Sequence, residues 1–150
     1  MKTVNATEMT ASEWELMRII WTKRKSSSSE VIKLIQEKKE WAESTVKTLL
    51  RRLVSKGALS TVRDGRRFIY SPNISENDAM DQMTAEMFAR LCDMKKGKEI
   101  AKLITETFLS RGDIRKIQGI LDKKYETAPK EVACNCLPDT NECTKENCCQ

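Results

Sequence analysis

The sequence contains no histidine among its 150 residues. Without an imidazole, the chain cannot assemble a Ser-His-Asp or Cys-His catalytic group, a zinc site of the His-Glu-x-x-His type, or a zinc finger with paired cysteines and histidines. No other catalytic constellation is recognisable, so an enzyme is the least expected class of protein.

Aromatic residues are scarce, at 5% of the chain, and no hydrophobic run approaches the roughly 20 apolar residues of a membrane-spanning helix. Leu, Ile, Val and Met must therefore fill the core of one or two small domains. The N-terminal segment has no apolar stretch after its lysine, unlike a secretory signal. We expect a cytoplasmic protein that does not bind membranes.

Cysteine is nearly absent from the first 133 residues, where Cys92 stands alone beside Leu91. An isolated cysteine next to an apolar residue is more often a small hydrophobic side chain than a functional thiol. We therefore expect Cys92 to be buried.

Positive charge is concentrated in the first half of the chain. Residues 1–72 hold 15 Lys and Arg against 8 Asp and Glu, whereas residues 73–150 hold 12 against 14. This distribution is expected if the first half neutralises the phosphates of a nucleic acid.

The segment 43–56 has the apolar spacing of a helix with one buried face. Its other face has hydroxyl side chains near the start and cations further along. A helix that enters the DNA major groove needs this distribution, because short side chains approach base edges and long cations reach phosphates. A merely solvated face is the alternative for this helix taken alone. The polar face consists of Ser44, Thr45, Lys47, Thr48, Arg51, Arg52 and Ser55.

A hairpin is predicted directly after this helix. Gly57 supplies the helix stop, and two short strands, 58–62 and 67–71, flank an Asp-Gly pair that favours a tight turn. A helix followed by a hairpin with a basic tip is the order of a winged helix, whose wing contacts the DNA backbone or minor groove. The basic residues of the tip are Arg63, Arg66 and Arg67.

We call the predicted helix over residues 43–56 the reading helix. Two further helices are predicted before it, over residues 11–22 and 28–39. Each follows a capping box, Thr10 with Glu13 and Ser27 with Glu30. Residues 1–9 are expected to be a loose leader, and residues 23–29 a polar linker. Trp14, Trp21 and Trp41 are expected to pack in or against the core. Residues 1–72 thus form the predicted DNA-binding domain.

Residues 73–125 are predicted to form three amphipathic helices, over 75–94, over 99–109, and after a cap at Asp113. Helices of this total length cannot bury their own apolar faces comfortably. We therefore expect a homodimerisation domain, which would place two reading helices on an inverted-repeat site.

The tail, residues 126–150, has few apolar residues and is rich in cysteine. Clustered thiolates without histidine select Cu(I) or Zn(II), and four of them from one tail, or two from each tail of a dimer, would suit zinc. An undefined role and a thiol redox sensor are the alternatives; nothing basic near the cysteines favours a reactive thiolate. The expected metal ligands are Cys134, Cys136, Cys143, Cys148 and Cys149.

Three stretches, residues 12–21, 41–57 and 65–72, resemble the penicillinase repressor family of winged-helix regulators, also called the BlaI/MecI family. The resemblance extends over residues 10–125. The cysteine-rich tail is similar to that of the copper-responsive CopY-type branch. That branch has two C-x-C pairs, whereas here the second pair is broken into Cys143 and Cys148-Cys149, which leaves metal stoichiometry open. Ala42 stands where many members have a capping hydroxyl residue.

The resemblance implies a mostly α-helical, homodimeric repressor of copper-homeostasis genes, acting on an operator of the TACA…TGTA kind. The zinc-bound dimer would hold the DNA. Cu(I) would then displace the zinc and release the operator, and a copper chaperone is a candidate donor of the Cu(I). Ser44, Thr45, Lys47, Thr48 and Arg52 match the family's recognition-helix contacts and Arg66 its wing arginine. Arg51 is added from helix geometry and Arg67 from its place at the hairpin tip.

Two other functions remain open from the sequence. One is a beta-lactam-responsive repressor that is inactivated by proteolysis between its domains. The other is a metal-buffering protein that does not bind specific DNA.

Overall fold

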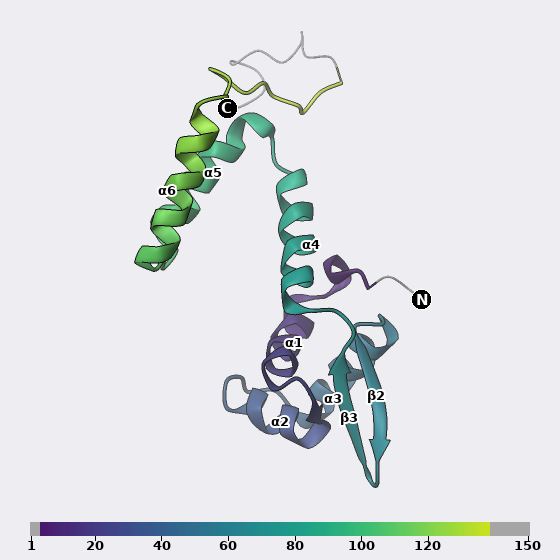
Figure 1. Cartoon of the computed structure of the whole chain (residues 1–150). Helices are drawn as coiled ribbons and strands as arrows, with labels where there is room; N and C mark the ends of the chain where they lie inside the picture. Colours follow the sequence, from purple (N-terminus) through teal and green to yellow (C-terminus); the bar gives the residue numbers. More distant parts are fainter. Residues whose placement is uncertain (1–3, 139–150) are drawn as a thin grey trace. The chain divides into compact units, whose positions relative to one another are not determined.

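The computed structural model describes residues 4–138, so the expected ligands Cys143, Cys148 and Cys149 lie outside the described residues. The chain divides into two compact units, Met1–Glu86 and Met87–Gln150 (Figure 1). The first unit contains a small three-stranded sheet and extends past Pro72 into the following helix. Within the described range, no helix combines the length and the hydrophobicity needed to cross a membrane.

The elements begin with a 3-10 helix, η1, before the helices and strands of the first unit. In chain order they are η1 (Ala6–Glu8), α1 (Ala11–Lys23), β1 (Ser26–Ser27), α2 (Ser28–Gln36), α3 (Glu43–Ser55), β2 (Leu59–Asp64), β3 (Arg67–Pro72), α4 (Glu76–Ala89), α5 (Asp93–Glu106) and α6 (Arg111–Tyr125).

Both predicted capping boxes are present at the starts of α1 and α2. The Thr10 side chain accepts a hydrogen bond from the Glu13 backbone N–H, and the Glu13 carboxylate accepts one from the Thr10 backbone N–H. Ser27 and Glu30 exchange the same two bonds. These reciprocal bonds satisfy N–H groups that would otherwise lack a partner in the first turn. α2 ends at Gln36, three residues before its predicted end.

The sheet has the order β1-β3-β2, with both strand pairs antiparallel. β1 was not predicted, because two serines in a polar linker carry no strand signal; they pair with Tyr70 and Ile69. β2 continues to Asp64, which pairs with Arg67, so the turn consists of Gly65 and Arg66. Gly65 has φ +64°, a value that glycine adopts without the steric cost that a Cβ brings.

The core of the first unit is aliphatic, as the scarcity of aromatic residues predicted. It joins the apolar faces of α1, α2 and α3 to β2. The expected loose leader is wrong for residues 4–9: Ala6 and Met9 are buried, and the Ala6 N–H donates to Gln82 Oε1 at 2.8 Å. Two buried apolar residues three positions apart are too few to give a periodic signal in the sequence.

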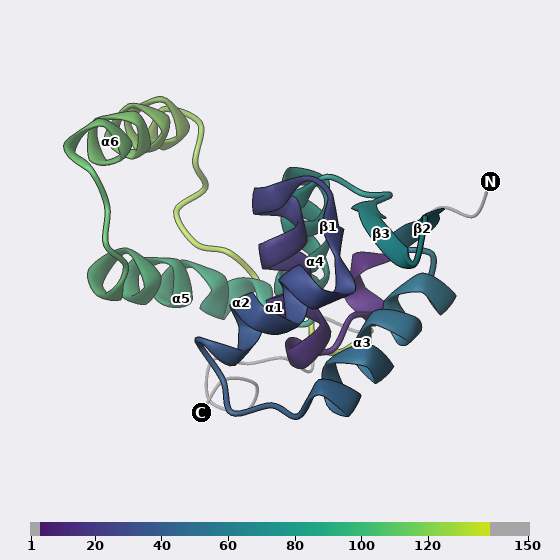
Figure 2. The same cartoon turned by 90° about the horizontal axis from the view of Figure 1, so that it is seen from below.

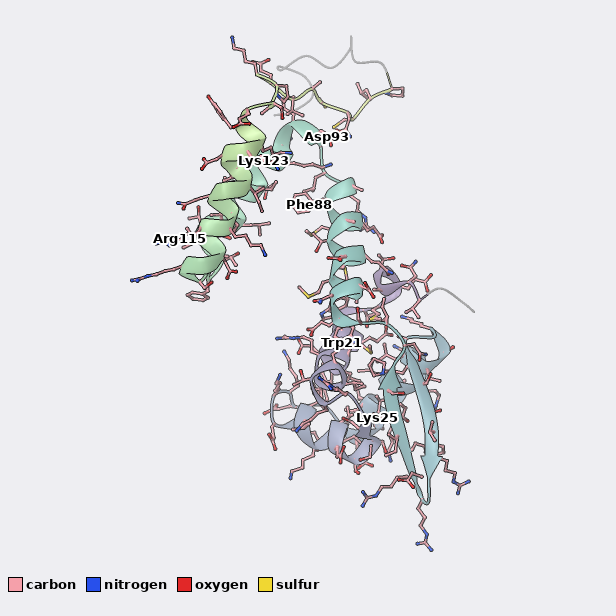
Figure 3. The ribbon with its side chains drawn as sticks, in the orientation of Figure 1. Trp21, Lys25, Phe88, Asp93, Arg115 and Lys123 are labelled. Atoms are coloured by element: carbon pink, nitrogen blue, oxygen red, sulfur yellow. The ribbon has the colours of Figure 1, made fainter. Side chains whose placement is uncertain are left out.

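The three tryptophans pack against this core, as expected. The rings of Trp14 and Trp21 meet edge to face at 5.2 Å between centroids. The Trp21 Nε1–H donates to the Ile74 carbonyl at 2.9 Å, which ties α1 to the segment before α4 (Figure 3). Trp41 lies half-buried before α3.

The helix break in the second half of the chain differs from the prediction. α4 ends at Ala89, and α5 begins at Asp93 after an extended Cys92. The predicted helix end at residue 94 and the predicted start at residue 99 are both wrong: residues 94–99 lie inside α5, where the helix tolerates Gly97 at a cost of about 1 kcal/mol. α6 is capped by Ser110, with the expected cap residue Asp113 as the third residue of its capping box.

The helices of the second unit expose their apolar faces. α5 and α6 contain no buried residue, and Leu103 and Leu121 are 48% and 50% exposed. The other large hydrophobic residues exposed on or between these two helices are Ile100, Ile104, Phe108, Ile114, Ile120 and Tyr125.

A buried ion pair joins α1 to the end of α3. Glu13 is fully buried, and its carboxylate accepts from Lys56 Nζ at 2.7 and 3.0 Å as well as from the Thr10 N–H. The lysine also donates to the Glu8 carbonyl at 2.8 Å. Removing one partner of a buried pair leaves an uncompensated charge, so this contact fixes α3 against α1.

We expect Lys56→Met to lower the free energy of unfolding by about 2–3 kcal/mol, because the buried Glu13 carboxylate loses its counter-charge. The matched control is Lys47→Met on the same helix, whose ion pair with Glu43 is exposed and should contribute less than about 0.5 kcal/mol. Urea denaturation measures both. Equal small losses in the two variants would contradict the role given to the buried pair.

Candidate DNA interface and thiol cluster

The polar face of α3 is open to solvent. Figure 2 shows this helix running along the outside of the first unit. Val46, Leu49, Leu50 and Leu53 turn into the core. That burial leaves the predicted contact residues Ser44, Thr45, Lys47, Thr48, Arg51 and Arg52 exposed together on the outer side.

Two of these side chains have local partners within the helix. Lys47 pairs with Glu43 at 2.6 Å, and the Thr48 hydroxyl donates to the Ser44 carbonyl at 2.9 Å. Both interactions are exposed and therefore weak, so they can be exchanged for contacts with a ligand. Among the described residues, neither Arg51 nor Arg52 forms an ion pair, which leaves two exposed cations without a counter-charge.

The two ends of α3 differ. At the C-terminus, the N–H groups of Gly57 and Ala58 donate to the carbonyls of Val54 and Leu53, with Gly57 at φ +79°. This arrangement confirms the predicted glycine stop. At the N-terminus, Ala42 provides no side-chain cap, as its methyl group requires, and only Glu43 in the first turn favours the helix dipole.

The β2–β3 hairpin places a second basic group in the same unit. Arg66 and Arg67 are exposed, and the Arg63 Nε–H donates to the Gly65 carbonyl at 3.2 Å, which braces the turn. Figure 3 shows nitrogen-bearing side chains projecting outward from the end of this hairpin. The first unit therefore has a basic helix face and a basic hairpin, each supported by the same core.

A cluster of three cysteines lies in the second unit. The Sγ atoms of Cys92, Cys134 and Cys136 all lie within 4.8 Å of one another, and those of Cys92 and Cys134 are 3.5 Å apart. Cys134 is 6% exposed, and its sulfur accepts from the Cys136 N–H at 3.4 Å. Three sulfur donors without oxygen or nitrogen ligands suit a soft metal ion rather than Mg²⁺ or Ca²⁺.

Cys92 was missed as a member of this cluster. It is half-buried, not the buried hydrophobic residue expected, and it lies beside the two cysteines of the predicted tail site. No sequence signal could find it, because Cys134 lies 42 positions further along the chain. The structure brings together Cys134 and Cys136 of the predicted ligands.

The Cys136 thiol is held in its protonated form when the cluster holds no metal ion. Hydrogen bonding to Cys134 and then to Cys92, with a further contribution from desolvation, raises the pKa of Cys136 to about 12. A reactive redox thiol needs the opposite shift, toward a thiolate at neutral pH. This thiol is therefore not poised for redox chemistry, although a bound cation would still displace its proton.

The trihelical core, the exposed basic face of α3 and the arginine-bearing hairpin define a winged-helix DNA-binding protein. The chain belongs to the penicillinase repressor family, which matches residues 9–123. This family consists of DNA-binding transcriptional repressors, not of enzymes.

Relatives cover most of the chain. A protein of Latilactobacillus sakei, described as an uncharacterised 16.5 kDa protein in the ptsI 3′ region, is 48% identical over 95% of this chain and 97% of its own length. The methicillin resistance regulatory protein MecI of Staphylococcus aureus is 29% identical over 78% of this chain and 95% of its own. The solved DNA-binding domain of the repressor BlaI is 38% identical, covers 52% of this chain and 93% of its own, and has a TM-score of 0.47.

We expect Arg66→Ala to weaken DNA binding about equally on all sequences and to reduce the slope of log affinity against log salt by about 1, because one phosphate contact is lost. Fluorescence anisotropy over a salt series measures this slope. Arg115→Ala, an exposed arginine of α6, removes the same charge and should leave the slope unchanged. An unchanged slope for Arg66→Ala would contradict a wing contact.

Proposed function

We propose that this protein is a homodimeric, metal-responsive repressor that binds an inverted-repeat operator and releases it when Cu(I) replaces Zn(II) at its cysteines. One observation carries the proposal: a single chain has both an exposed basic reading helix and a cluster of three thiols. The regulated genes would be those of copper homeostasis, and the protein would act in the cytoplasm.

Of the three clustered cysteines, Cys134 and Cys136 lie outside the part of the chain that the family shares, whereas Cys92 lies within it. The family match ends at residue 123, before Cys134 and Cys136. MecI matches over 78% of the chain, which leaves the rest without a counterpart in that relative. A function that is added to the shared repressor fold therefore belongs to the tail, and soft thiol ligands favour metal sensing.

The donor set fits a soft metal ion. Cys134 and Cys136, with Cys92, supply three thiolates in the described residues, which suits Cu(I) directly. A four-coordinate zinc site needs one further ligand, which Cys143, Cys148, Cys149 or the partner subunit could supply. The bound ion would contribute charge neutralisation and a cross-link between chain segments.

Operator contacts are assigned to the reading helix and the wing. Short side chains at the start of α3 would read base edges, and the cations would bind phosphates. The proposed contacts are Ser44, Thr45, Lys47, Thr48, Arg51, Arg52, Arg66 and Arg67.

The exposed apolar faces of α5 and α6 support a homodimer. Soluble monomers rarely expose large contiguous apolar surfaces, and a two-fold dimer would cover the faces and pair two reading helices. The dimer would thereby match the symmetry of an inverted repeat.

The direct test is fluorescence anisotropy of the reduced, zinc-loaded chain on a labelled inverted-repeat duplex, followed by anaerobic addition of Cu(I). We expect tight, sequence-selective binding that Cu(I) abolishes. Tight binding that ignores Cu(I) would favour a beta-lactam-responsive repressor, the function suggested by the name of MecI. Binding no better than to bulk DNA would favour a metal-buffering protein.

Removing the tail should separate the two functions. A chain lacking residues 134–150 should bind the operator but ignore copper, because the thiolates that carry the response are lost. The companion variant replaces all five tail cysteines by serine and keeps Asn135, so it controls for structural effects of truncation. A full copper response in both variants would exclude the tail as the sensor.

The dimer surface is tested by Leu103→Lys on α5. A buried ammonium in an apolar interface is costly, so the dimer dissociation constant should rise at least about tenfold. Thr105→Lys adds the same charge on the opposite side of the helix and should leave dimerisation unchanged. Analytical ultracentrifugation measures both; equal behaviour of the two variants would contradict an interface at Leu103.

A further inference from the structure

The cysteine cluster joins two segments of the chain that are far apart in sequence. Cys92 lies in the short link between α4 and α5, at the N-cap of α5, whereas Cys134 and Cys136 follow α6. Their sulfur atoms nevertheless lie within 4.8 Å of one another, inside one compact unit. The three donors therefore come from a single chain, without the help of a second subunit.

A contact that involves no sulfur holds the two segments together. The N–H of Asp93, the first residue of α5, donates to the Asn135 side chain at 3.0 Å. Cys92 makes no side-chain cap bond at this helix start, so Asn135 supplies the acceptor that the N-cap residue lacks. Because Asn135 stands between Cys134 and Cys136, the same bond places both thiols beside Cys92.

The start of α5 lies beside the cluster and contributes to the electrostatics around Cys92. Cys92 lies at the N-terminus of α5, where the helix dipole stabilises negative charge. In the first turn of this helix, Lys96 pairs with Asp93 at 2.6 Å, so the acidic side chain next to Cys92 is itself neutralised. The helix start therefore brings partial positive charge toward the sulfurs.

We propose that Cys92, Cys134 and Cys136 form an intrachain three-thiolate site for Cu(I), and that Asn135 is its positioning residue. The inference rests on the proposed function, since it names the ligands through which that function would be regulated. Cu(I) accepts three sulfur ligands, whereas structural zinc sites take four. The site thus includes a ligand, Cys92, that lies outside the cysteine-rich tail.

An ion at this site would cross-link two segments of the second unit. It connects the start of α5 to the segment after α6, and so closes a loop that contains both helices. Closing a long loop restricts the unfolded chain, and binding free energy becomes folding free energy. Cu(I) binding would therefore act on the two helices whose apolar faces are assigned to the dimer.

The test uses the full chain with Cys143, Cys148 and Cys149 replaced by serine, so that only the three clustered cysteines remain. Anaerobic competition with a chromophoric Cu(I) chelator measures affinity, and X-ray absorption counts sulfur ligands. We expect one Cu(I) per chain with three sulfur ligands. Adding Cys92→Ser should leave two sulfur ligands and weaken binding at least ~10- to 100-fold.

Two Asn135 variants test the positioning role in the same background. Asn135→Ala removes the acceptor and should weaken Cu(I) binding by about tenfold, whereas Asn135→Asp keeps an acceptor and should restore the affinity. A purely structural loss would leave the aspartate variant as weak as the alanine variant in this assay.

Two results would overturn the inference: equal Cu(I) affinity with and without Cys92, or two sulfur ligands in both chains. Failure of the proposed function looks different. A three-sulfur Cu(I) site that requires Cys92, in a wild-type chain whose operator binding ignores Cu(I), would keep the site and reject copper-controlled repression. Conversely, a normal copper response of a chain in which Cys92→Ser is the single change would keep the repressor and reject this site.

Discussion

The buried carboxylate of Glu13 is the constraint on which the DNA-binding unit depends. It completes the capping box of α1 and accepts the ammonium of Lys56 at the end of α3, while Lys56 also holds the Glu8 carbonyl. A carboxylate removed from water is costly unless it is paired and hydrogen-bonded, so these three segments are stable only in this arrangement. The orientation of the reading helix against α1 follows from it, and a rigid reading helix is what specific DNA recognition requires.

Much of the first unit was predictable because its signals are local. The capping residues of α1 and α2, the stop at Gly57 and the turn at Gly65 are each decided by a few neighbouring residues. β1 and the ordered leader were not predictable, since two serines and a short apolar pair acquire their structure only from distant partners such as Tyr70 and Gln82. The exposure of the basic face of α3 followed directly from its helical period.

The second unit was less predictable because much of its structure depends on contacts between residues that are far apart in the sequence. Lysines and a glycine at residues 95–97 suggested a helix end, yet local propensity is weak and the chain continues through them as α5. The thiol cluster brings residues near the start of α5 together with residues after α6, as does the hydrogen bond from Asp93 to Asn135, and no periodic pattern encodes such contacts. Sequence could identify two of its cysteines by their density in the tail, but it could not identify Cys92.

The alanine at the N-cap of α3, Ala42, bears on both the stability of this helix and its binding of DNA. The methyl group leaves the first N–H groups of α3 without a side-chain acceptor, at the end of the helix that carries its hydroxyl residues. Such groups at a helix start are a ready site for an anion, and a DNA phosphate is the anion nearest to a helix that enters the major groove. In the proposed operator complex, a phosphate would supply the acceptor that the Ala42 side chain does not provide. The stability that α3 gained from this bond would then contribute to affinity for DNA and not to the fold of the free protein.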